Sequence, residues 1–154
     1  MRSTVKPIPE GYHTVTPYLI IKGAAEALDF YKKAFGATEL FRMDQPNGKI
    51  GHAEMKIGDS TIMLSDEYPD MDYAGPKTLG GSPVSIMLYV EDVDAVFNCA
   101  ISAGAEQQVP LVDKFYGDRS GSVVDPFGYV WHIATHKEDV ALEEMEKRMT
   151  AASH

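Results

Sequence analysis

The sequence predicts an α+β protein built from two copies of one βαβββ module, followed by a C-terminal helix. The first observation is a repeat, because Gly51 and Gly58 recur 70 residues later as Gly121 and Gly128. The second is the pattern inside each repeat, where a β-branched and aromatic stretch precedes apolar residues at helical spacing and then further strand-like segments. Self-similarity at a nearly fixed spacing is typical of a duplicated unit.

The first module is predicted to span about residues 13–66 and the linker that follows residues 67–82. Gly36 is expected to stop the helix of this module. The Asn47-Gly48 pair predicts a hairpin turn because it accepts positive φ at low cost. Pro17 indicates that the first strand lies at a sheet edge, or that this backbone position faces away from any partner, since proline has no N–H to donate. The predicted elements are a strand over residues 13–21, a helix over 24–35, and strands over 38–43, 49–57 and 60–66.

The second module is predicted to span about residues 83–136, and a C-terminal helix about residues 139–151. The segment from Asp125 to Gly128 (DPFG) predicts a tight turn between the last two strands. The spacing of Thr135 and Glu138 resembles a capping box, which favours a helix just beyond it. The apolar stripe of that helix is narrow and predicts a position on the surface or on a partner subunit. The predicted elements are a strand over residues 83–90, a helix over 92–103, a strand over 105–112, a loop over 113–119 and a strand pair over 121–136.

The composition describes an ordinary globular protein. Of the 154 residues, 44% are hydrophobic and 24% are charged, and the net charge is −9. Nucleic-acid binding is not expected, because phosphates require clustered Lys and Arg and here these residues are scattered. No apolar run approaches the roughly 20 residues that a membrane helix needs.

The single cysteine, Cys99, cannot form an internal disulfide. This usage and the absence of an apolar signal core at the N-terminus favour the cytoplasm. Cys99 is interpreted as a small packing residue of its helix rather than as a nucleophile.

The alternation of side chains along the strands predicts where a ligand could bind. Residues two apart on a strand leave the same face, so His52 and Glu54 are expected together, opposite Ala53 and Met55. Two modules can curve their sheets into an open trough with both helices outside. A concave, partly apolar surface with a few polar groups is typical of a small-molecule site.

Several short motifs point to one family. They are LDFYKKAFGA at residues 28–37, HAE at 52–54, IMLSD at 62–66, YVEDVD at 89–94, and GDR at 117–119 followed by DPFG at 125–128. With these motifs the chain resembles the vicinal oxygen chelate superfamily, which includes glyoxalase I, extradiol dioxygenases and bleomycin-resistance proteins. Within it the chain is most similar to the PhnB-like branch. The resemblance covers roughly residues 14–137 and implies a glyoxalase-like fold and a homodimer.

The resemblance also implies where a metal would be held. Enzymes of the superfamily hold a divalent metal with side chains from four strands, two in each module. Aligned on the family motifs, the four positions fall on Thr16, Ile62, Ser85 and His132, of which only His132 readily ligates a metal. No cofactor is therefore predicted. If a divalent metal is bound, His52, Glu54 and His132 are its expected ligands.

For several polar residues two interpretations stay open. His52 and Glu54 form a trough-lining acid–base pair or a solvated cross-strand ion pair. Arg119 clamps a carboxylate or phosphate, or it pairs with Asp118 or Asp125. His132 is interpreted as a hydrogen-bonded pocket residue, and His136 as a structural residue. The predicted ligand-binding residues are Thr16, Tyr18, His52, Glu54, Ser85, Met87, Tyr89, Tyr116, Arg119 and His132.

These residues and the family resemblance support two hypotheses of function. The first is binding of a small, partly apolar or aromatic molecule in the sheet trough, without the usual metal site. The alternative is a metal-dependent lyase, isomerase or dioxygenase with a rearranged site around His52, Glu54 and His132. The expected partners are a small molecule and a second copy of the chain, with no nucleic acid and no membrane.

Overall fold

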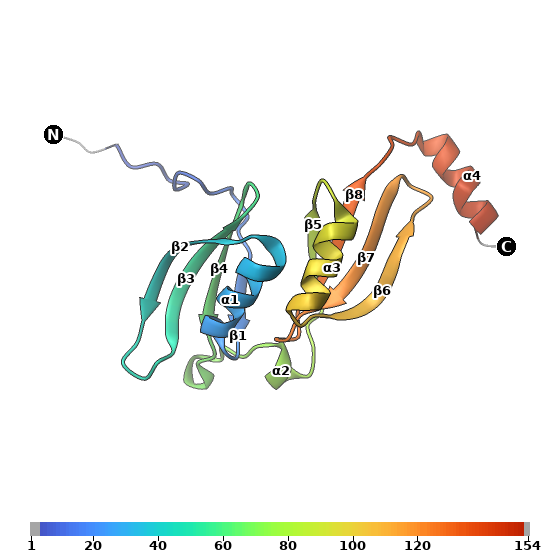
Figure 1. Cartoon of the computed structure of the whole chain (residues 1–154). Coiled ribbons are helices and arrows are strands. Elements are labelled where there is room, and N and C mark those ends of the chain that lie inside the picture. The colour runs from blue at the N-terminus through green and yellow to red at the C-terminus, as the bar shows by residue number, and fades with distance from the viewer. Residues whose placement is uncertain (1–3, 153–154) are drawn as a thin grey trace. The chain divides into compact units, whose positions relative to one another are not determined.

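A computed structural model describes residues 4–152 of the chain. The chain divides into two compact units, Met1–Gly81 and Ser82–His154. Each unit holds one mixed four-stranded sheet, as Figure 1 shows. The predicted α+β class with its two βαβββ modules and C-terminal helix is confirmed. The hypothesis that the two sheets curve around one shared trough stays a prediction.

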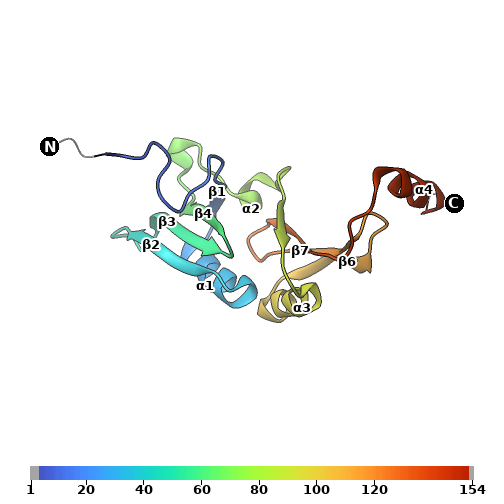
Figure 2. The ribbon, with the colours of Figure 1, turned by 90° about the horizontal axis from the view of Figure 1, so that it is seen from above.

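In the first unit the sheet has the strand order β1-β4-β3-β2. Strand β1 runs parallel to β4, and the other neighbours are antiparallel. Helix α1 covers one face of this sheet (Figures 1 and 2) and buries Leu28 and Tyr31 completely. The elements are β1 (Tyr18–Ile21), α1 (Ala24–Phe35), β2 (Thr38–Asp44), β3 (Ile50–Ile57) and β4 (Ser60–Asp66).

The second unit repeats this order as β5-β8-β7-β6, with α3 against one face of the sheet. Its core includes Trp131 and Ile133 on β8 and Val123 on β7, all three with no exposed surface. The elements are β5 (Ile86–Tyr89), α3 (Val93–Ala103), β6 (Glu106–Asp113), β7 (Asp118–Val124), β8 (Val130–His136) and α4 (Leu142–Ala152). The linker between the modules holds a 3-10 turn, η1 (Pro69–Met71), and a short helix, α2 (Pro76–Leu79).

The two modules anchor their helices with different side chains at corresponding positions. In the first, the buried carboxylate of Asp66 accepts hydrogen bonds from the backbone N–H groups of Gly23, Ala24 and Ile50 at 2.7–3.1 Å. In the second, the Thr135 hydroxyl accepts from the N–H of Val93 at 2.9 Å and donates to a carbonyl of the preceding loop. Each side chain therefore satisfies an N–H group at the start of a helix that has no partner within that helix.

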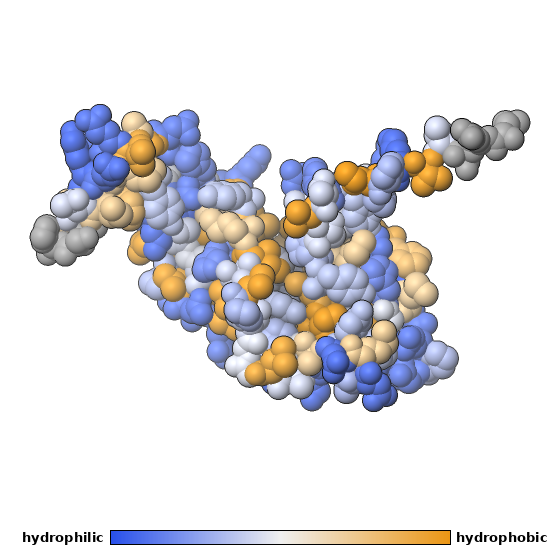
Figure 3. Space-filling model, turned by 180° about the vertical axis from the view of Figure 1, so that it is seen from behind, coloured by the Kyte–Doolittle hydropathy of each residue, from blue (hydrophilic) through white to orange (hydrophobic). Residues whose placement is uncertain are grey.

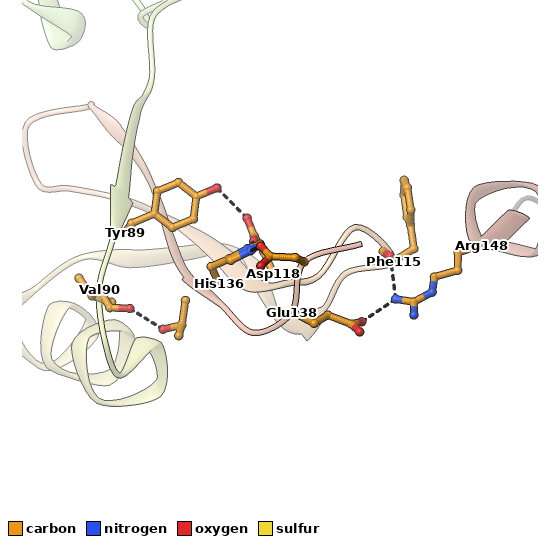
Figure 4. Close-up of polar contacts among 9 residues, drawn as sticks. Tyr89, Val90, Phe115, Asp118, His136, Glu138 and Arg148 are labelled. Atoms are coloured by element: carbon orange, nitrogen blue, oxygen red, sulfur yellow. Dashed lines mark hydrogen bonds and ion pairs between the residues drawn. The ribbon is translucent and has the colours of Figure 1, made fainter. Parts of the chain in front are cut away.

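The predicted capping box is wrong, because Thr135 lies in β8 and its hydroxyl contacts α3 instead of the C-terminal helix. Helix α4 itself begins at Leu142, which is exposed. Arg148 attaches α4 to its unit, since its guanidinium donates to Glu138 at 2.5 Å and to the carbonyl of Phe115 at 3.2 Å (Figure 4).

Three further predictions differ from the structure in detail. The first strand begins at Tyr18, after Pro17, because proline cannot donate to the ladder. Strand β7 begins at Asp118, inside the predicted loop. Cys99 is exposed, so its interpretation as a packing residue is wrong.

The turn over residues 125–128 forms as predicted. The Asp125 carboxylate accepts from the N–H groups of Phe127 and Tyr129, and Gly128 takes a φ of 96°. The same carboxylate accepts from the indole N–H of Trp131 at 2.9 Å. This turn therefore sets the register of β7 against β8, in which Val124 pairs with Val130.

The outer strands β2 and β6 carry irregularities at corresponding places. Register shifts lie between Glu39 and Phe41 in β2 and between Gln107 and Val109 in β6. Strand β6 also holds Pro110, which has no backbone N–H. No helix within residues 4–152 is long and apolar enough to cross a membrane.

Candidate functional site

The face of the first sheet opposite α1 carries a mixed set of side chains. Ala53 and Met55 on β3 have no exposed surface, whereas His52 and Glu54, which alternate with them, are only half-buried. This burial confirms the predicted alternation of β3. The strand register sets Glu54 beside Met63 of β4 and Phe41 of β2, and sets Met63 beside Tyr18 of β1. The row therefore crosses all four strands on one open face.

Tyr18, His52 and Glu54 form one hydrogen-bonded network on this face. The Tyr18 hydroxyl lies 2.9 Å from Nδ1 of His52, and Nε2 of His52 lies 2.7 Å from a Glu54 carboxylate oxygen. An ionised carboxylate only accepts hydrogen bonds, so Nε2 of His52 carries a proton. In the neutral ring Nδ1 then accepts the hydrogen bond of the Tyr18 hydroxyl. The hydroxyl oxygen of Tyr18 keeps its lone pairs for other donors.

Apolar rings and chains surround this network. The Phe41 ring centroid lies 6.3 Å from that of His52, and the Tyr18 ring centroid lies 5.5 Å from it. Phe41 is 48% exposed and Met43 is 55% exposed. Apolar residues reach the surface of the molecule in several such patches, shown in orange in Figure 3. The open face of the first sheet thus combines exposed apolar groups with an ordered polar centre.

The corresponding face of the second sheet holds four more of the predicted residues, Ser85, Met87, Tyr89 and His132. Nε2 of His132 lies 3.0 Å from the hydroxyl of Ser85, and Met87 pairs with His132 in the strand register. Met87 and Tyr89 are both exposed. The structure therefore places Ser85, Met87, Tyr89 and His132 on one face, and Tyr18, His52 and Glu54 on another face in the other unit.

Asp118, which was not predicted as a site residue, organises a second network. Its carboxylate is 4% exposed, and it accepts from the Tyr89 hydroxyl and from Nδ1 of His136, both at 2.7 Å (Figure 4). Nε2 of His136 lies 2.7 Å from a carboxylate oxygen of Asp139. These bonds to Asp118 and then Asp139 raise the pKa of His136. The bond to Asp118 also raises the pKa of Tyr89.

The register of the predicted hairpin is the sequence signal that could have revealed this network. The turn at residues 125–128 pairs Val124 with Val130, and counting outward from it brings Asp118 opposite His136. The prediction instead treated residues 113–119 as loop and His136 as a residue at the end of its strand.

Arg119 lies on the other face of β7, where it pairs with Thr135 in the strand register. Its guanidinium makes a bidentate contact with Asp94 of α3 at 2.9 and 3.0 Å and lies 3.4 Å from Asp113. These contacts raise the pKa of Arg119 and lower that of Asp94. Arg119 is therefore engaged by residues other than the predicted Asp118 and Asp125.

Two further predicted residues lie outside both networks. The Tyr116 ring packs edge-on against Phe115 in the turn between β6 and β7, with centroids 5.2 Å apart. The Thr16 hydroxyl donates to the carbonyl of His13 at 3.4 Å, just before β1.

The side chains at the four positions that the resemblance implies for a metal do not fit one here. Ile62 is 4% exposed among the apolar residues of β3 and β4, and Thr16 and Ser85 offer only hydroxyls. His132 alone has a side chain that readily ligates a divalent metal. Within residues 4–152 no three His, Cys, Asp or Glu side chains gather in a geometry that could hold a metal ion.

Comparison with known proteins identifies the family. Residues 12–133 match the model of the Glyoxalase/Bleomycin resistance protein/Dioxygenase superfamily. The chain belongs to this superfamily. The chain is also similar to an uncharacterised protein of Mycobacterium bovis, which is 43% identical over 140 residues that cover 89% of this chain and 92% of the relative.

Solved structures agree with the superfamily fold. A Pseudomonas aeruginosa protein is 29% identical and superposes with a TM-score of 0.67 over 82% of this chain and 99% of its own. A Bacillus cereus PhnB protein, described as a putative 3-demethylubiquinone-9 3-methyltransferase, is 19% identical and superposes with a TM-score of 0.64. It covers 80% of this chain and 99% of its own. This second likeness concerns the fold alone.

Proposed function

We propose that this member of the superfamily binds a small, partly apolar or aromatic molecule on the open faces of its sheets, without a metal at the family's four positions. The observation that carries the proposal is the open face of the first sheet. Exposed Phe41 and Met43 lie there beside the ordered network of Tyr18, His52 and Glu54. Apolar groups left on a folded surface are typical of binding sites, and a few fixed polar groups orient the bound molecule.

The hydrogen-bond network supports a preference in the ligand. Because the Tyr18 hydroxyl donates to His52, its oxygen offers acceptor lone pairs to a bound molecule. A ligand that carries a hydroxyl or N–H group can donate to this oxygen, whereas an ether or ester cannot.

Matched probes test the binding and the preference together. We expect 4-ethylphenol to bind more tightly than 4-ethylanisole, which has the same ring and lacks the O–H group. Binding is followed by two-dimensional ¹H–¹⁵N NMR, and the amides of β3 and β4 should shift in a saturable way. No saturable shift with either probe would contradict the proposal.

Variants separate the apolar contribution from the polar one. Phe41→Ala should weaken binding of both probes about tenfold, because contact area on the open face is lost. Tyr18→Phe should remove the difference between the two probes. Leu79→Ala is the matched control, since Leu79 is exposed in α2, outside both sheets. An effect of Leu79→Ala equal to that of Phe41→Ala would mean that the probes bind non-specifically.

A homodimer remains part of the proposal. The exposed apolar side chains Leu142 and Met149 of α4 support it, because an amphipathic helix left uncovered can pack on a second copy. Light scattering coupled to size-exclusion chromatography measures the mass directly. A mass equal to that of one chain at micromolar concentration would contradict this part.

A further inference from the structure

The second unit contains a cavity of about 480 Å³ at the end of its sheet. One wall is the turn between β6 and β7, and the other is the segment that follows β8. Its lining residues are Asp113, Lys114, Gly117, Asp118, Lys137 and Glu138. None of the four positions that the family uses for a metal lies among them.

Backbone hydrogen bonds hold the two walls together. The carbonyl of Gly117 accepts from the N–H of Lys137 at 2.8 Å and from the N–H of Glu138 at 3.1 Å. Gly117 has a φ of 103°, and a Cβ at this position would clash with the carbonyl oxygen of Glu138. Only glycine allows so close an approach, so the cavity has a fixed backbone frame.

Each carboxylate that lines the cavity already has a partner. Glu138 accepts from Arg148, and Asp118 accepts from Tyr89 and His136, as Figure 4 shows. Asp113 lies 3.4 Å from the guanidinium of Arg119. Each of these carboxylates is therefore already engaged by a hydrogen-bond donor or a cation at the edge of the cavity.

The two lysines of the lining differ from these carboxylates. Within residues 4–152 the ammonium groups of Lys114 and Lys137 form no ion pair or hydrogen bond, although Lys137 contributes at longer range to the lowered pKa of Asp94. Two cations without a close ion pair, on facing walls of a cavity, can attract a negatively charged group. An oxyanion fits such a pair, since its oxygens can accept from both ammonium groups at once.

We propose that this cavity binds a small oxyanion, a carboxylate or a phosphate, between Lys114 and Lys137. The proposal does not depend on the binding of an aromatic molecule by the open sheet faces. The ligand is a free small molecule or the charged end of a larger one, because the cavity is open to solvent.

The test is an NMR titration of the full-length protein with inorganic phosphate and, separately, with succinate. Sodium chloride at matched ionic strength is the reference in each case. Saturable shifts confined to the amides of residues 114, 117, 137 and 138 would support the proposal, and the arm that saturates at lower concentration identifies the preferred oxyanion. Shifts no larger than those caused by sodium chloride in both arms would overturn it.

A pair of charge variants decides whether the lysines are responsible. Lys114→Gln with Lys137→Gln should weaken the binding at least about tenfold. Lys77→Gln with Lys147→Gln removes the same charge from exposed sites elsewhere. This control should change the affinity for the oxyanion by no more than about twofold. Equal weakening in both double variants would overturn the proposal in favour of a general charge effect. Thermal unfolding of each variant confirms that the fold is retained.

Discussion

Nδ1 of His136 lies 2.7 Å from the carboxylate of Asp118, which is 4% exposed and also accepts from the Tyr89 hydroxyl. Nε2 of the same ring faces Asp139. Both ring nitrogens thus face carboxylates that only accept hydrogen bonds, and the imidazolium form alone can donate to both. His136 therefore joins the end of β8 to the segment leading into α4 through charge-assisted bonds.

This arrangement predicts a pH-dependent stability. The folded pKa of His136 is raised above its ordinary value of 6.5, first by Asp118 and then by Asp139. The stabilisation of the folded state by protonated His136 is therefore fully present below about pH 6.5, and it is lost as the pH rises through the folded pKa of His136. We expect the difference in Tm between the wild type and His136→Gln to shrink steadily as the pH rises from about 6.5 through the folded pKa of His136. An NMR titration that puts the His136 pKa at or below 6.5 would contradict this prediction.

Asp66 is predicted to be the polar residue whose loss most weakens the first unit. Asp66→Ala should lower the free energy of unfolding by about 2–4 kcal/mol, because buried N–H groups of Ala24 and Ile50 lose their acceptor. Asp66→Asn keeps one acceptor oxygen and should lower the free energy of unfolding by less than Asp66→Ala does. Urea unfolding measures both variants, and Asp29→Ala on the exposed side of α1 should stay within about 0.5 kcal/mol. A loss for Asp66→Ala as small as for this control would disprove the anchoring role.

Two glycines with positive φ should respond differently to the same substitution. Gly48 has a φ of 82° and no atom within 4 Å of an added Cβ, so Gly48→Ala should cost about 1 kcal/mol of backbone strain. Gly117→Ala adds a clash with the carbonyl of Glu138 and should cost at least about 2 kcal/mol more. Thermal and urea unfolding of the two variants provides the comparison. Equal losses would show that the frame of the cavity relaxes freely.

Removal of divalent metals is predicted to leave stability unchanged. The side chains at the family's metal positions include a buried isoleucine, Ile62, and only one good donor, His132. Protein purified without chelator should have the same Tm before and after dialysis against EDTA. A fall in Tm after EDTA that is reversed by zinc, nickel, manganese or iron would favour the metal-dependent alternative, provided that His52→Ala or His132→Ala abolishes this response.

Much of the fold could be predicted because local signals and the duplication agree. Asn47-Gly48 and the segment 125–128 placed two turns, and Gly36 ended α1 as expected. The alternation of His52 and Glu54 with Ala53 and Met55 gave the open face of β3 directly. These features depend on neighbours in sequence, which a single chain reveals.

The remaining features depend on partners that are distant in sequence. Thr135 looked like a helix cap, yet its hydroxyl bonds to Val93, 42 residues earlier. Arg119 was expected to clamp a carboxylate or phosphate, or to pair with Asp118 or Asp125. It contacts Asp94 on α3 most closely, and no local pattern indicates that partner. Ile62 was assigned to a metal position, and only the structure shows that its strand turns this side chain into the core, away from the open face.

The register shifts in β2 and β6 have a consequence for how the molecule behaves at high concentration. A straight outer strand with free N–H and C=O groups is a template on which strands of other molecules can add and grow into fibrils. The bulged β2, and the bulged, proline-containing β6, interrupt that template at one rim of each sheet. The protein can therefore leave apolar side chains exposed on its sheets while β2 and β6 resist edge-to-edge aggregation.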